Sequence, residues 1–234
     1  MGRHVRVGSS PPRSFPMMDP LHLVIAIGPL SAYFLLLAWI NLGKAPFLTT
    51  GSRDALVLGI GLVGLVMVGP MELFLPEATV VAFGAWVWVV LLLFYLVSLV
   101  LLVLLLRPRI VIYNVSPEQM RVALAEVVSR LDPDSRWAGN CLLMPHLGVQ
   151  LVVEPAEAVK NVQLVSAGRE QNYASWRVLA GALSQTLRKS RGERSPYGMF
   201  LLSVGISLAT AMTYLLVVHG NSIRDSIDQM LRVG

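Results

Sequence analysis

Histidine and carboxylate side chains that could hold a metal ion occur near the ends of the long apolar segments of this chain. In the topology that the charge distribution favours, five of them lie at one level on the outer face of a membrane. Imidazole and carboxylate groups at one depth could bind a divalent cation. Polar residues also gather at membrane ends without binding a ligand, so the metal site and the plain interfacial role both stay open. The five residues are Asp19, His22, Glu72, Glu77 and His219.

Three glycines at positions 59, 61 and 64 match the letters of a dinucleotide-binding fingerprint. That fingerprint requires a preceding strand and a water-filled crevice. Here it lies inside an apolar segment, where small residues let helices approach closely. We therefore predict that these glycines are packing positions, together with Ala55 and Gly69.

No other motif in the sequence indicates catalysis. Cys141 is the only cysteine, which excludes an intramolecular disulfide and a cysteine-cluster metal site. We expect Cys141 to be a buried packing residue and His146 to lie exposed in a hairpin turn. The sequence therefore predicts no enzyme activity, no catalytic residues and no bound cofactor.

The composition is that of a chain solvated mainly by lipid. Hydrophobic residues make up 55% of the 234 residues and charged residues only 14%, against roughly 25% charged residues in a soluble domain. The formal charge is +5. No aromatic interleaving or binding motif accompanies the bases, so we do not expect nucleic acid as a partner. The sixteen arginines against three lysines hint at a bacterial genome.

Four apolar segments are long enough to cross a bilayer as helices, which needs about 20 residues each. They are residues 21–42, 55–75, 79–106 and 196–218. Residues 1–18 form a Gly, Ser, Pro and Arg tract without periodicity, which we expect to be a disordered leader with the true start at Met17 or Met18. A short amphipathic tail follows at 219–234.

The positive-inside rule favours an outer N-terminus in the cell (inner) membrane. That orientation places eight bases on the cytoplasmic side, and the leader arginines are the one conflict. Four of the eight form a basic cluster that we expect to contact the membrane surface: Arg188, Lys189, Arg191 and Arg194.

Residues 107–195 have mixed polarity and predict a small cytoplasmic α+β domain inserted before the fourth membrane helix. A β-branched run at 109–113 suggests a strand, and Ser116-Pro117 begins a helix that ends at Asp132-Pro133. Three further strands are expected at 137–144, 149–154 and 162–166, and a second helix at 172–189. The predicted order is βαβββα, in two layers with a four-stranded sheet.

These features favour a multi-pass membrane protein that anchors a cytoplasmic protein-interaction domain, as a scaffold or assembly factor. The protein partner would bind through residues 109–190, and the chain could form a homo-oligomer. A transporter or channel subunit is the alternative, although few ionisable groups lie at mid-bilayer depth. A membrane enzyme with the outer-face metal site is the third candidate.

Overall fold

A computed structural model describes residues 20–74, 86–156, 160–168, 172–190 and 195–224. Residues 1–19, 75–85 and 225–234 lie outside these ranges, together with three shorter segments at 157–159, 169–171 and 191–194. The predictions for Asp19, Glu77, Arg191 and Arg194 therefore fall outside the described structure, as does the choice of start residue.

Four helices are long and apolar enough to span a membrane. They are α1 (Pro20–Leu42), α2 (Gly51–Phe74), α4 (Trp86–Leu105) and α7 (Tyr197–Val218). At about 1.5 Å per residue each reaches the roughly 30 Å needed to cross the hydrocarbon core. The segments predicted from the sequence therefore correspond to real helices, although α2 begins four residues before the predicted position 55.

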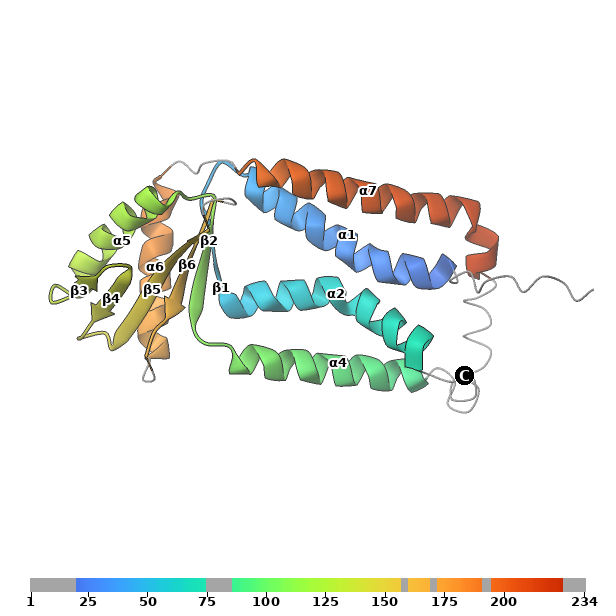
Figure 1. The fold of residues 1–234 in the computed structure, drawn as a ribbon, viewed down its shortest axis with the longest axis horizontal. Coiled ribbons are helices and arrows are strands. Elements are labelled where there is room, and N and C mark those ends of the chain that lie inside the picture. The colour runs from blue at the N-terminus through green and yellow to red at the C-terminus, as the bar shows by residue number, and fades with distance from the viewer. Residues whose placement is uncertain (1–19, 75–85, 157–159, 169–171, 191–194, 225–234) are drawn as a thin grey trace, which may run out of the picture.

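The four helices lie side by side as one row in the order α7, α1, α2, α4 (Figure 1). α1 packs against both α7 and α2, whereas α4 packs against α2. Exposed aromatic side chains mark both ends of the row. Trp39 and Tyr197 lie at one end, and Trp86 and Tyr214 lie at the other, as in the aromatic belts of membrane proteins.

Glycine contacts hold the row together. An added methyl group at Gly64 would collide with the backbone carbonyl of Ile25 on α1, and one at Gly59 would collide with Leu99 on α4. A methyl group at Gly61 would lie 2.7 Å from Tyr33. The predicted packing role of these three glycines is confirmed. Gly69 is different, because nothing lies within 4 Å of the position its methyl group would take.

A six-stranded antiparallel sheet lies beyond one end of the helices (Figure 1). Its spatial order is β1-β2-β6-β5-β4-β3. The strands are β1 (Phe47–Thr50), β2 (Arg109–Tyr113), β3 (Arg136–Ala138), β4 (Cys141–Met144), β5 (Val149–Ala156) and β6 (Asn161–Ser166).

Two helices, α5 (Pro117–Leu131) and α6 (Tyr173–Arg188), cover one face of the sheet. Their apolar faces meet the sheet in one core, in which Leu124, Leu164 and Leu183 are fully buried. The Ser116 hydroxyl accepts a hydrogen bond from the Gln119 N–H, which confirms the predicted N-cap of α5. We call the six strands with α5 and α6 the α+β unit.

The predicted order βαβββα is wrong in two places. β1 lies in the connection between α1 and α2, where no strand was predicted, and it pairs antiparallel with β2. The predicted single strand at 137–144 is two strands, β3 and β4, which pair as a hairpin across Gly139 and Asn140. Gly139 has φ +61°, a conformation that glycine adopts without steric cost.

Candidate functional site

Strand β1 joins the α+β unit to the four long apolar helices. Its residues pair with β2 in the register Phe47↔Tyr113 to Thr50↔Ile110. At its end the chain passes directly into α2 at Gly51, without an intervening residue. Because β1 is continuous with α2, the sheet cannot reorient without moving the start of α2.

Side chains of β2 contact the first turn of α2. The Tyr113 hydroxyl donates a hydrogen bond of 2.7 Å to Asp54 Oδ1, and Arg109 Nη2 lies 3.9 Å from Asp54 Oδ2. Burial, followed by the hydrogen bond to Asp54 and its negative charge, raises the pKa of Tyr113 far above its ordinary value. Tyr113 therefore stays protonated and acts as a donor at any physiological pH.

Asn114 contacts the end of α1. It is fully buried and has φ +60°, a conformation that side-chain-bearing residues seldom adopt. Its Nδ2 donates a hydrogen bond of 2.5 Å to the Ile40 carbonyl, with the Gly43 and Ala45 carbonyls at 3.4 and 3.5 Å. The Ile40 carbonyl also accepts a hydrogen bond from the Gly43 N–H at 3.1 Å, so Asn114 adds a second hydrogen bond to the end of α1 from the sheet side.

The start of α7 meets the same helix end. The Ser195 N–H donates to the Asn41 carbonyl at 3.2 Å, and a methyl group at Gly198 would lie 3.1 Å from Asn41 Cβ. Asn41 Oδ1, Asn114 Oδ1 and Ser195 Oγ are buried without a hydrogen-bond partner among the described residues. Buried polar atoms of this kind are commonly hydrogen-bonded to ordered water molecules. We call the region where the α+β unit meets the ends of α1 and α2 the seam. Its residues are Asn41, Asp54, Arg109, Tyr113 and Asn114.

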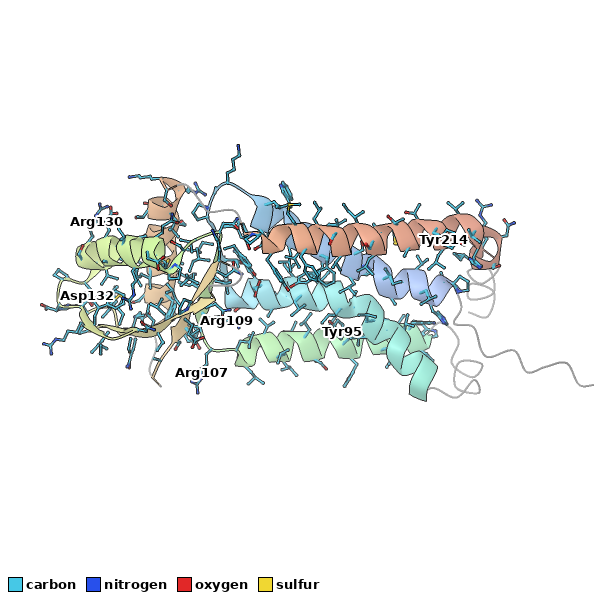
Figure 2. The ribbon with its side chains drawn as sticks, turned by 45° about the horizontal axis from the view of Figure 1, so that its top comes forward. Tyr95, Arg107, Arg109, Arg130, Asp132 and Tyr214 are labelled. Atoms are coloured by element: carbon cyan, nitrogen blue, oxygen red, sulfur yellow. The ribbon has the colours of Figure 1, made fainter. Side chains whose placement is uncertain are left out.

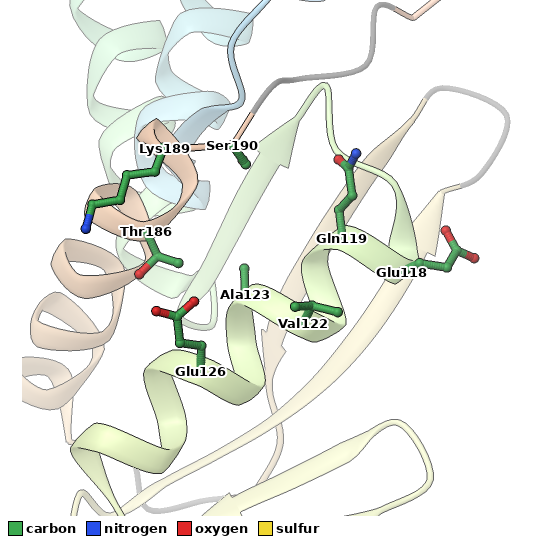
Figure 3. A pocket seen from close by; sticks show the side chains of 8 residues that line it. All are labelled: Glu118, Gln119, Val122, Ala123, Glu126, Thr186, Lys189 and Ser190. Atoms are coloured by element: carbon green, nitrogen blue, oxygen red, sulfur yellow. The ribbon is translucent and has the colours of Figure 1, made fainter.

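A groove lies between α5 and α6 on the surface of the α+β unit (Figure 3). Its volume is about 600 Å³. Val122 lies in the groove with 71% of its surface exposed. Glu118 and Glu126, one turn before and one turn after Val122 on α5, also line the groove. Thr186 of α6 lines the groove as well, with Lys189 and Ser190, which directly follow this helix.

An Asp–His pair connects α5 to the turn between β4 and β5. Asp132 is fully buried and accepts hydrogen bonds from the His146 and Leu147 N–H groups, and from His146 Nδ1 at 2.9 Å. His146 Nε2 lies 3.5 Å from Asp134. As predicted, His146 lies in the turn and is mostly exposed. No sequence motif predicts its contacts with Asp132 and Asp134.

The Asp132 and His146 pKa values move in opposite directions. The hydrogen bond to Asp132, and then the charges of Asp132 and Asp134, raise the pKa of His146. Burial raises the pKa of Asp132, but the hydrogen bonds from His146 and Leu147 outweigh burial, so the pKa of Asp132 is lowered. Each charge therefore stabilises the other.

The structure describes only part of the predicted outer-face metal set. His22 and His219 lie at the helix ends farthest from the sheet, and the His22 ring centroid is 6.1 Å from that of Trp88. No group of three or more His, Cys, Asp or Glu side chains within the described residues could hold a metal ion. The structure shows Arg188 and Lys189 exposed at the end of α6, and Cys141 is half-buried rather than buried.

No protein-family model, no curated protein and no solved structure matches this chain.

Proposed function

We propose that the chain is an integral protein of the cell membrane with its α+β unit on the cytoplasmic side. Support comes from the aromatic residues at both ends of the helix row and from the distribution of charge. Six bases among the described residues lie at or near the end next to the sheet: Lys44, Arg53, Arg107, Arg109, Arg188 and Lys189. Basic residues next to membrane helices favour the cytoplasmic side.

The role that we propose is that of a membrane-anchored scaffold or assembly factor, which binds a protein partner through the groove between α5 and α6. The observation that carries this proposal is the exposure of Val122 in the groove. Its side chain lines the groove and has 71% of its surface exposed, the largest exposed fraction among the large apolar side chains described in the α+β unit.

The chemistry of the groove suggests which partner fits. Glu118, Val122 and Glu126 are four residues apart and share one face of α5. Glu126 is paired with Arg130 at 2.5 Å, whereas Glu118 is exposed. A partner segment with an apolar side chain over Val122 and a basic side chain near Glu118 would complement this face.

Site-specific photo-crosslinking in native membranes tests the proposal. A photoreactive residue replaces Val122, and the matched control carries it at Val178, an exposed valine of α6 that does not line the groove. We expect one dominant crosslinked protein at position 122 that is absent at 178 and is lost when Glu118 is changed to Lys. Equal crosslinking at both positions, or none at 122, would reject the groove as a binding site.

A further inference from the structure

The His146 ring lies between two carboxylates in the part of the α+β unit away from the four long helices, where Figure 2 labels Asp132. His146 Nδ1 is 2.9 Å from Asp132 Oδ1, and His146 Nε2 is 3.5 Å from Asp134 Oδ2. The Asp132 side chain is fully buried, whereas 73% of the Asp134 side-chain surface is exposed. The two ring nitrogens therefore face carboxylates in very different surroundings.

Only the protonated ring can donate to both carboxylates. An imidazolium has two N–H donors, whereas a neutral imidazole has one donor nitrogen and one acceptor nitrogen. After deprotonation the remaining proton stays on Nδ1, because the buried Asp132 carboxylate requires its hydrogen-bond donors. The Nε2 lone pair then faces the Asp134 carboxylate. Loss of one proton therefore changes the contact with Asp134 from attractive to repulsive and leaves the contact with Asp132 in place.

The contact with Asp134 holds the chain just before the outer edge of the sheet. β3 begins two residues after Asp134 and is the last strand in the sheet order. It has three residues, all exposed, and it pairs only with β4 among the described strands. The Ser135 N–H donates to the Asp132 carbonyl at 3.1 Å, so a tight turn connects Asp132 to β3. Release of Asp134 therefore loosens the start of the shortest strand in the sheet.

We propose that His146 is a pH-sensitive switch, whose protonated ring holds residues 132–135 against the turn between β4 and β5 and whose deprotonation releases Asp134 and the start of β3. An edge strand presents unpaired backbone groups with which another chain can pair. The switch therefore sets how firmly this edge of the sheet is held. The proposal depends neither on the groove between α5 and α6 nor on the orientation in the membrane.

The charges around His146 determine the pH range of the switch. Within the described residues, Asp132 and Asp134 are the charged groups that act on the ring. The hydrogen bond to Asp132, and then the charges of the two carboxylates, raise the pKa of His146 above its ordinary 6.5. Release of Asp134 is therefore expected as the pH rises through a value above 6.5.

Hydrogen–deuterium exchange of the full chain in detergent tests the switch. Protection of residues 133–138 is measured by mass spectrometry below and above the titration midpoint of His146, with correction for the intrinsic pH dependence of amide exchange. Asp134→Asn removes the exposed carboxylate and keeps the His146–Asp132 contact, whereas His146→Gln removes the titrating ring. Glu154→Gln, at an exposed carboxylate on β5, is the matched control. Residues 161–166 of β6, inside the sheet, are the internal reference.

We expect deprotonation to lower the protection of residues 133–138 by about twofold to threefold in the wild-type chain and in Glu154→Gln, and to leave residues 161–166 unchanged. Asp134→Asn and His146→Gln should both abolish this pH dependence. A full pH dependence in Asp134→Asn would assign the effect to the Asp132 contact and overturn the switch, although the coupling of His146 to Asp132 would stand. Equal protection at both pH values in the wild-type chain, or an unchanged pH dependence in His146→Gln, would also overturn it.

Discussion

The Tyr113 hydroxyl donates a 2.7 Å hydrogen bond to Asp54 Oδ1, and these two residues stand 59 positions apart in the chain. Tyr113 belongs to the sheet and Asp54 to α2, so this bond fixes the sheet relative to α2. A Tyr113→Phe substitution removes the donor and keeps the ring. Because the acceptor is charged, we expect the substitution to cost about 1–2 kcal/mol of stability, seen as a lower melting temperature in detergent. Tyr173→Phe, at an exposed tyrosine, should change nothing; an equal effect of both would contradict the role of Asp54.

Two substitutions of Asn114 separate the cost of its positive φ from the loss of its hydrogen bond to Ile40. Asn114→Gly keeps the φ of +60° accessible and removes the hydrogen bond to Ile40. Asn114→Ala removes the same bond and adds a left-handed alanine, which costs about 1–2 kcal/mol more. We therefore expect the order of melting temperatures to be wild type, then Gly, then Ala. If the Gly and Ala variants melt together, the positive φ at this position is not required by the fold.

The α1–α2 contact depends on Gly64. An alanine there would collide with the Ile25 carbonyl, and backbone cannot move aside as a flexible side chain can. We expect Gly64→Ala to destabilise the helix row by about 1–3 kcal/mol, whereas Gly69→Ala, with open space at its methyl position, should be neutral or slightly stabilising. Thermal denaturation of both variants in the same detergent decides the matter. A Gly64→Ala protein as stable as the Gly69→Ala protein would argue against close packing of α1 on α2.

The Asp132–His146 pair predicts a pH dependence of the α+β unit. The pKa of His146 is raised above its ordinary 6.5, so its stabilising contribution is complete below about pH 6.5 and is lost as the pH rises through the folded-state pKa. The pKa of Asp132 is lowered below 3.8, so its contribution is complete above about pH 3.8 and is lost as the pH falls through its folded-state pKa. The stabilising contributions of Asp132 and His146 are therefore both fully present between about pH 3.8 and pH 6.5.

NMR titration of the His146 ring tests this coupling. We expect a midpoint above 6.5 in the wild-type chain, and a lower midpoint when Asp132→Asn removes the negative charge. Asp134→Asn should lower the midpoint less, because Asp134 lies farther from the ring and is exposed. A midpoint that does not respond to Asp132→Asn would show that the carboxylate does not stabilise the imidazolium.

The local signals in the sequence predicted the helices and their packing but not the seam. Ser116 and Pro117 identify the start of α5, and the glycines at 59, 61 and 64 identify the faces of α2. The four residues Phe47–Thr50 carry no pattern that distinguishes a strand from a loop, because their pairing partner Tyr113 lies far away in the sequence. The contacts of Asp54 and Asn114 depend on the pairing of β1 with β2, so the sequence did not predict them either. Gly139-Asn140, by contrast, is a dipeptide typical of two-residue hairpin turns, so the division of residues 137–144 into two strands was predictable from the sequence.

We propose that the four apolar helices span the membrane and that the α+β unit lies on the cytoplasmic side. Because Cys141 is the only cysteine, a Cys141→Ser background permits single-cysteine labelling with a membrane-impermeant maleimide. Val122→Cys reports the α+β unit, and Asn221→Cys, at an exposed residue beyond the end of α7, reports the opposite end of the helices. We predict that intact cells label only position 221 and that position 122 labels only after permeabilisation. The reverse pattern would contradict the orientation, and labelling of both positions in intact cells would contradict the claim that the helices separate them by a membrane.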